Sequence, residues 1–281
     1  MTRLDVHKTY KLYINGEFPR SESGRSYPAL DAAGQVVARV ARASRKDLRD
    51  AVRAARTALP KWAGKTGYNR GQILYRMAEM VEDRIDAFRD QLELGGISSA
   101  RARSEVGRSI DRLVWYAGWC DKFAQVYGNL NPVAGPFFNI SAPEPTGVVG
   151  VVAPEEPALL GLVSRLAPVL AGGNTVVLIA SNQRPLPAIT FAEVLETSDL
   201  PAGMVNILTG DTAELIPWLA DHMDVNAIDV TGAGSDVRLR VEQGSVHNVK
   251  RVVASDDPDG QSPYLIAAFT ETKTVWHPKG L

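Results

Sequence analysis

The chain has 281 residues, of which 45% are hydrophobic and 22% charged, and it contains a single cysteine. A net charge of −1 at pH 7 gives no general attraction to nucleic acid or to an anionic membrane surface. One cysteine excludes an internal disulfide and a cysteine-rich metal site, and the four histidines lack ligand-like spacing. No apolar run approaches the roughly 20 residues of a membrane span, and the N-terminus lacks a signal-peptide core. We therefore expect a cytoplasmic globular protein without a bound metal.

The first half of the sequence predicts an extended arm followed by helices. Residues 10–43 alternate short β-like stretches with turn residues, which is typical of an extended arm or a small antiparallel unit. Ser44 opens a capping box, and the helix that follows is predicted to stop at Pro60. Apolar spacing predicts a second helix over about 73–95 and a third over about 102–127.

The single cysteine, Cys120, falls in the apolar stripe of the third predicted helix. A nucleophilic cysteine needs electropositive and partly exposed surroundings, usually with a base, and only the nearby Lys122 suggests such surroundings. We therefore interpret Cys120 as a packed thiol with a structural role.

From residue 146 onward, short apolar runs alternate with helical patterns. The predicted strands cover residues 147–152, 175–179, 205–208, 227–230 and 249–253. Near-continuous apolar strands that alternate with helices predict a buried parallel sheet with right-handed crossovers. The predicted fold class is therefore α/β, with a Rossmann-like doubly wound parallel sheet preceded by a helical and extended N-terminal arm.

In such a sheet the ligand site lies in the turns after the strands, and three of these turns carry suggestive residues. Residues 231–237 resemble a glycine-rich phosphate loop only weakly, because Val237 stands at the third glycine and Asp236 would repel a phosphate. A plain glycine turn is the simpler interpretation. Glu155 and Glu156 could do acid and base work, but acids at the start of a helix more simply complement its dipole. Residues 255–260 lack the bidentate glutamate of a calcium loop and predict a surface turn.

Several stretches together resemble the aldehyde dehydrogenase family. In chain order they are residues 11–17 (KLYINGE), 115–122 (WYAGWCDK), 144–150 (EPTGVVG), 167–178 (APVLAGGNTVVL), 200–207 (LPAGMVNI) and 222–225 (HMDV). The resemblance covers about residues 10–268 and stops before the catalytic domain of that family, which we expect to be absent. The domains it implies are an N-terminal arm with helices (1–136), a β-hairpin oligomerisation element (137–147), a Rossmann-like NAD-binding domain (148–268) and a C-terminal tail (269–281).

Carried over residue by residue, the resemblance implies that most functional positions are altered. The active-site motif Pro-Trp-Asn-Phe-Pro falls on residues 154–158, so that the oxyanion-stabilising asparagine becomes Glu156, which only accepts hydrogen bonds and adds negative charge. The ribose-binding Lys-Pro-Ala-Glu becomes residues 179–182, with Ile179 and Asn182 at its two charged positions. The charged grip on the cofactor is therefore expected to be lost.

The remaining motifs of the family are also incomplete. Thr231 and Gly232 of its Phe-Thr-Gly-Ser turn survive, but the serine falls on Ala233, and helix glycines near the adenine fall on Thr212 and Ile216. Asp256 or Asp257 could replace the general-base glutamate, although the spacing does not support it, and the nucleophilic cysteine has no counterpart downstream. We expect no catalytic residues and no cofactor, but a vestigial pocket formed by Pro154, Glu156, Ile179, Asn182, Thr231, Gly232 and Ala233.

The resemblance implies a pseudoenzyme that assembles with a full-length aldehyde dehydrogenase or with itself. In the family the hairpin works together with the catalytic domain and the C-terminal tail, which we expect to be missing here. We predict interface residues Phe137, Phe138 and Ile140 in the hairpin and Trp276 in a terminal segment that is either a docking peptide or a frayed end. The alternatives are an NAD(P)-dependent aldehyde oxidoreductase and a nucleotide-binding sensor, each with NAD or NADP as its cofactor.

Overall fold

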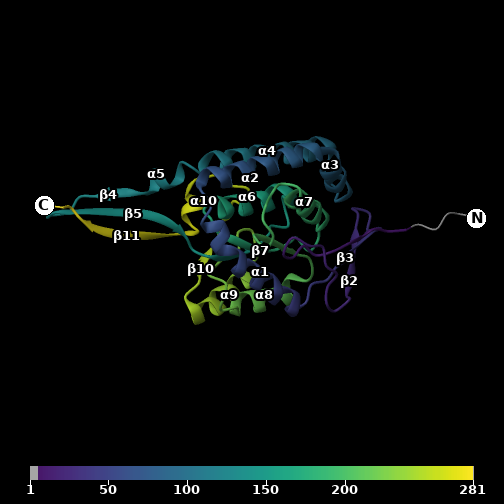
Figure 1. The fold of residues 1–281 in the computed structure, drawn as a ribbon. Helices are drawn as coiled ribbons and strands as arrows, with labels where there is room; N and C mark the ends of the chain where they lie inside the picture. The colour runs from purple at the N-terminus through teal and green to yellow at the C-terminus, as the bar shows by residue number, and fades with distance from the viewer. Residues whose placement is uncertain (1–5, 281) are drawn as a thin grey trace, which may run out of the picture.

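The computed structural model describes residues 6–280 and is built around a five-stranded parallel sheet (Figure 1). The strands are β6 (Val148–Val152), β7 (Thr175–Ile179), β8 (Val205–Leu208), β9 (Ala227–Asp229) and β10 (Arg251–Val253). They lie in the order β10-β9-β6-β7-β8, and each is within two residues of its predicted position. Every residue of β6, β7, β8 and β9 is buried, as expected of a sheet covered on both faces. The predicted Rossmann-like α/β architecture is confirmed.

Helices cover both faces of this sheet. One face carries α6 (Ala158–Ala171) and α7 (Leu186–Glu196), and the other carries α1 (Arg45–Ala63), α8 (Thr212–Asp221) and α9 (Ser235–Ser245), followed by a short 3-10 turn (Val246–Asn248). Two further helices, α2 (Gly67–Asp83) and α4 (Ser99–Trp119), pack on the outside of α6. All 14 residues of α6 are therefore buried, which explains why its sequence is apolar on every side.

The N-terminal helices differ from their predicted boundaries in two places. The second predicted helix is two helices, α2 and α3 (Ile85–Leu94), because Arg84 leaves the helical region with φ −110° and ψ 20°. The third is also divided, into α4 and the short α5 (Phe123–Tyr127), and Cys120 is the buried residue that ends α4.

The first helix continues past Pro60 to Ala63, beyond its predicted end. Its last turn is held by Trp62, which is fully buried and donates a 3.1 Å hydrogen bond from Nε1 to the carbonyl oxygen of Leu170. This tertiary contact outweighs the single backbone hydrogen bond that the proline removes. Among residues 6–280, no helix is both long enough and apolar enough to cross a bilayer.

Two small sheets lie at opposite ends of the central body (Figure 1). The N-terminal sheet contains β1 (Thr9–Tyr10), β3 (Val36–Ala41) and β2 (Ser26–Leu30) in that order. At the other end β4 (Asn129–Asn131), β5 (Phe137–Pro145) and β11 (Thr270–Pro278) form an antiparallel sheet that extends away from the body, which we call the projecting sheet. A single turn of helix, α10 (Tyr264–Ala267), precedes β11.

The projecting sheet corrects the prediction for the end of the chain. Residues 270–278 pair with β5 over its whole length, from Thr270 opposite Pro145 to Pro278 opposite Phe137. They are neither a frayed end nor a free docking peptide, because they form the third strand of the projecting sheet. The sequence of β11 hides this role because its only strongly apolar residues, Val275 and Trp276, are adjacent and so lie on opposite faces.

Candidate functional site

The strand order reverses between β6 and β9, and in sheets of this kind ligands bind outside the carboxyl ends of the strands at such a reversal. We call this end of the sheet the carboxyl edge. Two residues of the vestigial pocket, Pro154 and Gly232, lie in contact there. Gly232 has a φ of +78°, and a Cβ atom at residue 232 would lie only 3.2 Å from Pro154 Cβ. Ile179 is fully buried at the end of β7. Glu156 is exposed and forms an ion pair with Arg184, in the loop that leads into α7.

Glu155 and Glu156 do not complement the dipole of α6, which corrects our interpretation of them. Glu155 instead binds the turn after β7, where it accepts hydrogen bonds from Ser181 Oγ and from the backbone nitrogens of Asn182 (3.1 Å) and Gln183 (3.2 Å). Glu156 forms a 2.7 Å ion pair with Arg184. Both acidic side chains are thus engaged by the loop that leads into α7.

The start of α6 is capped by a residue that the sequence did not single out. Glu105, a buried side chain of α4, accepts hydrogen bonds from the backbone nitrogens of Leu159 (2.8 Å) and Leu160 (3.3 Å). A carboxylate in this position satisfies free N–H groups and favours the positive end of the helix dipole. The helix end that could have received an anionic ligand is therefore occupied by the protein itself.

A buried ion pair lies beneath the turn after β9. Arg165 of α6 and Asp229 of β9 are each only 1% exposed, and Arg165 Nε lies 3.8 Å from Asp229 Oδ2. Arg165 also donates to Thr231 Oγ1 (3.2 Å), and Asp229 accepts from the backbone nitrogen of Thr231 (2.9 Å). Burial raises the pKa of Asp229, and the guanidinium of Arg165 opposes that shift. The only signals in the sequence were one arginine in an apolar helix and one aspartate in an apolar strand.

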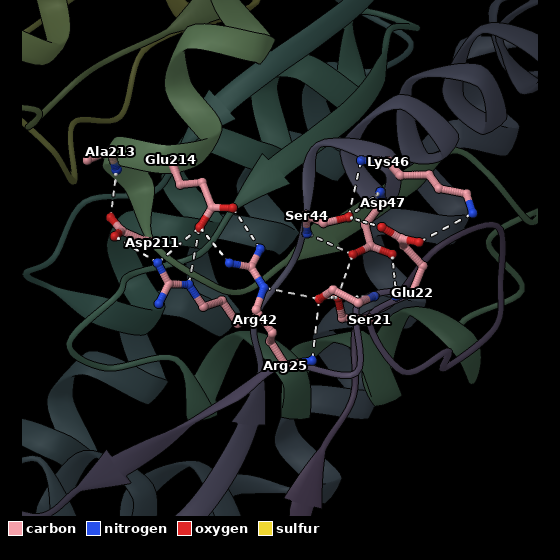
Figure 2. A network of polar contacts seen from close by, with 11 residues as sticks. Ser21, Glu22, Arg25, Arg42, Ser44, Lys46, Asp47, Asp211, Ala213 and Glu214 are labelled. Carbon is pink, nitrogen blue, oxygen red and sulfur yellow. Dashed lines mark hydrogen bonds and ion pairs between the residues drawn. The ribbon is translucent and has the colours of Figure 1, made fainter.

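The turn after β8 is fastened to the N-terminal segment by a second ionic cluster (Figure 2). Glu214 accepts from Arg25 Nη2 at 2.7 Å and from Arg42 Nη2 at 3.0 Å, while Arg42 also lies 3.3 Å from Asp211. These guanidinium groups lower the pKa of Glu214. Asp211 in addition caps α8 by accepting a 3.0 Å hydrogen bond from the backbone nitrogen of Ala213. Ion pairs of Arg25 and Arg42, which flank β2 and β3, thereby fix the N-terminal sheet to the carboxyl edge.

The segment 255–260 forms the predicted turn and packs on the same edge. Pro258 lies against Gly232, and two arginines of α4 hold the far end of the segment. Arg112 donates from Nη1 to Ser164 Oγ (2.6 Å) and to the carbonyl oxygens of Asp259 (2.5 Å) and Gly260 (2.7 Å). Arg108 forms a 2.5 Å ion pair with Asp259. The turns after β7, β8, β9 and β10 are thus all bound by side chains of this same chain.

Among the described residues, the ion pairs at this edge join carboxylates to arginines, and the one thiol is that of Cys120. Cys120 is 4% exposed and lies on α4, and burial raises its pKa to about 12, so the thiol is a poor nucleophile at neutral pH. The cavity that reaches Glu156 has a volume of about 330 Å³ and is also lined by Arg101, Arg108 and Arg184. Among residues 6–280, no three His, Cys, Asp or Glu side chains converge to hold a metal ion.

The predicted interface residues come together in the projecting sheet but divide between its two faces. Phe138 and Ile140 share one face with Leu130 and Val275, since Leu130, Ile140 and Val275 are paired across the three strands. These four side chains are between 43% and 67% exposed, and we call them the apolar face.

The opposite face carries aromatic and polar groups. Phe137 and Trp276 contact each other there with their ring centroids 5.8 Å apart. Behind them Asn131 Nδ2 donates to Asn139 Oδ1 (2.6 Å) and to Ser141 Oγ (2.8 Å). The two faces of the projecting sheet therefore differ in composition. The four side chains of the apolar face are all apolar, whereas here the exposed rings of Phe137 and Trp276 lie beside polar groups that satisfy each other.

Comparisons with known proteins agree with this architecture. The model of the aldehyde dehydrogenase family matches residues 19–275. The chain is 34% identical over 275 residues to cytosolic 10-formyltetrahydrofolate dehydrogenase of Mus musculus. The matched region covers 95% of this chain and 30% of the relative. It is 33% identical over 261 residues to mitochondrial benzaldehyde dehydrogenase of Antirrhinum majus, covering 91% of this chain and 48% of that protein.

Solved structures give the same result. PnpE from Pseudomonas sp. WBC-3 superimposes with a TM-score of 0.84 at 28% identity, covering 88% of this chain and 50% of that one. Aldehyde dehydrogenase from Bacillus cereus, solved as its NAD+ complex, has a TM-score of 0.83 at 27% identity with the same coverage. The chain spans half or less of the length of these proteins. From its sequence match and its fold, the chain belongs to the aldehyde dehydrogenase family.

Proposed function

We propose that this chain is a non-catalytic member of the family that assembles, through its projecting sheet, with a full-length aldehyde dehydrogenase. The observation that carries the proposal is the apolar face formed by Leu130, Phe138, Ile140 and Val275. Contiguous exposed apolar side chains on a soluble protein mark a surface that another protein covers. A second copy of this chain is the other occupant that would produce the same burial, and the two differ in the composition of the complex.

Three features support the non-catalytic part of the proposal. The family resemblance assigns Glu156 to the oxyanion position, where a carboxylate only accepts hydrogen bonds and would repel the negative charge that develops on an aldehyde oxygen. Cys120 is buried with a raised pKa. The turns of the carboxyl edge are already bound by Glu155, Arg112 and the Glu214 cluster.

We propose further that the chain binds neither NAD nor NADP. We also propose that it works in the cytoplasm, because the name of the mouse relative describes that protein as cytosolic. Titration calorimetry with each nucleotide tests the cofactor part. No heat of binding is expected at nucleotide concentrations up to about 1 mM, which corresponds to an affinity weaker than about −4 kcal/mol. Micromolar binding would instead favour the nucleotide sensor, and turnover of any aldehyde by the isolated chain would establish the oxidoreductase.

The assembly is tested by co-expressing the chain with a full-length aldehyde dehydrogenase of the same organism and measuring the mass of the complex by light scattering. We expect a complex that contains both chains, and we expect Ile140→Lys to abolish it. Leu30→Lys is the matched control, because Leu30 has a similar exposure on the N-terminal sheet at the opposite end of the molecule. Recovery of this chain as a monomer only, with the enzyme present in excess, would refute the proposal.

A further inference from the structure

A cavity of about 780 Å³ lies between the first turns of α1 and the end of α8, and no residue of the vestigial pocket lines it. Its apolar surface comes from Leu48, which is buried, and from Trp218 and Met223, whose side chains are partly exposed. Its volume falls within the range of sites that bind small molecules. The family resemblance assigned no role to any of these residues.

The polar groups of the cavity leave one positive charge without a carboxylate. Lys46 pairs with Glu22 at 3.3 Å, Arg49 pairs with its neighbour Asp50, and Asp221 is engaged by Arg240. The guanidinium of Arg45 has no ion pair and no hydrogen bond within residues 6–280, and it lies over the ring of Trp218. The cavity therefore carries a surplus of about one positive charge, and that charge is a guanidinium.

The guanidinium of Arg45 has a fixed position beside an aromatic ring. Its central carbon lies 4.0 Å from the ring centroid of Trp218. A planar guanidinium stacked in this way keeps its N–H groups free at its edge, where they match the two oxygens of a carboxylate. Two of the backbone N–H groups at the start of α1 are already engaged, because those of Lys46 and Asp47 donate to Ser44 Oγ.

We propose that this cavity binds a small planar aromatic carboxylate. The ring lies against Trp218, Met223 and Leu48, and the carboxylate forms a bidentate ion pair with Arg45. A single negative charge fits better than a phosphate dianion, since the carboxylates of Glu22 and Asp221 also line the cavity and would repel a second charge. Burial lowers the pKa of His222, so that this imidazole adds no positive charge at neutral pH.

The test uses 2-naphthoate as the probe and the full chain as the receptor, with affinity measured by calorimetry. We expect saturable binding with one site per chain. Two analogues should each bind about tenfold more weakly: 2-naphthamide, which lacks the charge, and cyclohexanecarboxylate, which lacks the aromatic ring. A tenfold loss is about the cost of one charged hydrogen bond or one ring contact. Equal affinities for naphthoate and naphthamide would overturn the proposal.

Variants and hydrogen exchange locate the binding. Arg45→Gln should weaken naphthoate binding about tenfold. Arg53→Gln, an exposed arginine of the same helix outside this cavity, should leave it unchanged. In the unmodified chain, naphthoate should slow amide exchange in residues 44–49 and 215–223, a readout that does not depend on any variant folding. Binding without this protection, or equal losses in the two variants, would refute the site.

Discussion

The carboxyl edge of the central sheet and the projecting sheet treat their functional groups in opposite ways. At the carboxyl edge, where this fold binds ligands, buried and half-buried charges are paired within the chain, as in Arg165 with Asp229 and Glu214 with Arg25 and Arg42. On the projecting sheet the four side chains of the apolar face are between 43% and 67% exposed, although Lys279 Nζ lies over the ring of Phe138. The charges of the carboxyl edge are paired within the chain, whereas the apolar side chains of the projecting sheet remain exposed to water.

This difference indicates where the chain has an interaction left to make. An edge whose charges are internally paired gains little from a ligand, because the ligand would have to displace contacts of similar strength. An exposed apolar face gains free energy from any complementary surface that removes it from water. Substitutions in the two regions should therefore have opposite consequences, with stability affected at the carboxyl edge and association affected at the projecting sheet.

The largest effect is expected from Asp229→Ala. This change leaves the guanidinium of Arg165 buried without its counter-charge, and it should lower the free energy of unfolding by about 3–5 kcal/mol, measured by urea denaturation. The control is the double variant Arg165→Met, Asp229→Ala, which should recover most of the loss because neither charge then remains buried. A loss below about 1 kcal/mol in the single variant would mean that the pair does not hold the edge together.

Arg112→Leu should have the next largest effect, about 2–3 kcal/mol, because the two N–H groups of Arg112 Nη1 are shared among three acceptors and each is worth about 1–1.5 kcal/mol. Amide exchange in residues 255–262 should accelerate, since two of those acceptors lie in that segment. Arg108→Leu removes only the more exposed ion pair with Asp259 and should cost less than about 1 kcal/mol. If both variants lose the same amount, the buried contacts are not what holds the segment.

Glu214→Gln should cost about 0.5–1 kcal/mol at neutral pH, and that cost should depend on pH. Because Arg25 and Arg42 lower the pKa of Glu214 in the folded state, its carboxylate stabilises the protein above the unfolded value of about 4.3. That contribution is lost as the pH falls through the lower folded value. The difference in unfolding free energy between the wild type and the variant should thus shrink below about pH 4, and a difference that stays constant down to about pH 3 would contradict the linkage.

The smallest effect on stability is expected from Ile140→Lys. The side chain is half exposed, so the unfolding free energy of the isolated chain should change by no more than about 0.5 kcal/mol, although assembly is lost. Thermal unfolding of the purified variant measures this directly. A large destabilisation would show that the apolar face supports the fold of the chain itself, and the contrast between the two regions would then disappear.

Sequence patterns predicted the central sheet well because its physics is local. Strands such as β7 are short apolar runs that any buried parallel strand must show, and the capping box at Ser44 places the start of α1 correctly. The errors at Pro60 and Arg84 have a different origin. Packing of Trp62 allows α1 to continue past Pro60, and a local change of dihedral angles at Arg84 separates α2 from α3. Neither effect changes the spacing of apolar residues, which was the basis of the prediction.

The candidate site was less predictable because its contacts join distant parts of the chain. Position-by-position comparison identified Glu156 and Asn182 as altered, but it could not show that Glu155 binds the turn at Ser181 or that Arg165 and Asp229 form a pair. Pairs separated by more than 20 residues become visible only when the sheet brings them together. The role of β11 was hidden for the same reason, since its partner strand lies about 130 residues earlier.

That separation has a consequence for the order of events during synthesis. The hydroxyls of Ser141 and Thr274, on adjacent strands of the projecting sheet, are 133 positions apart in the chain. The nine-residue pairing of β5 with β11 cannot form until everything between them has been made, and pairing over so long a loop is slow. Before that moment β5 has only the three residues of β4 beside it. The apolar face is therefore completed late, when Val275 of β11 joins Leu130, Phe138 and Ile140.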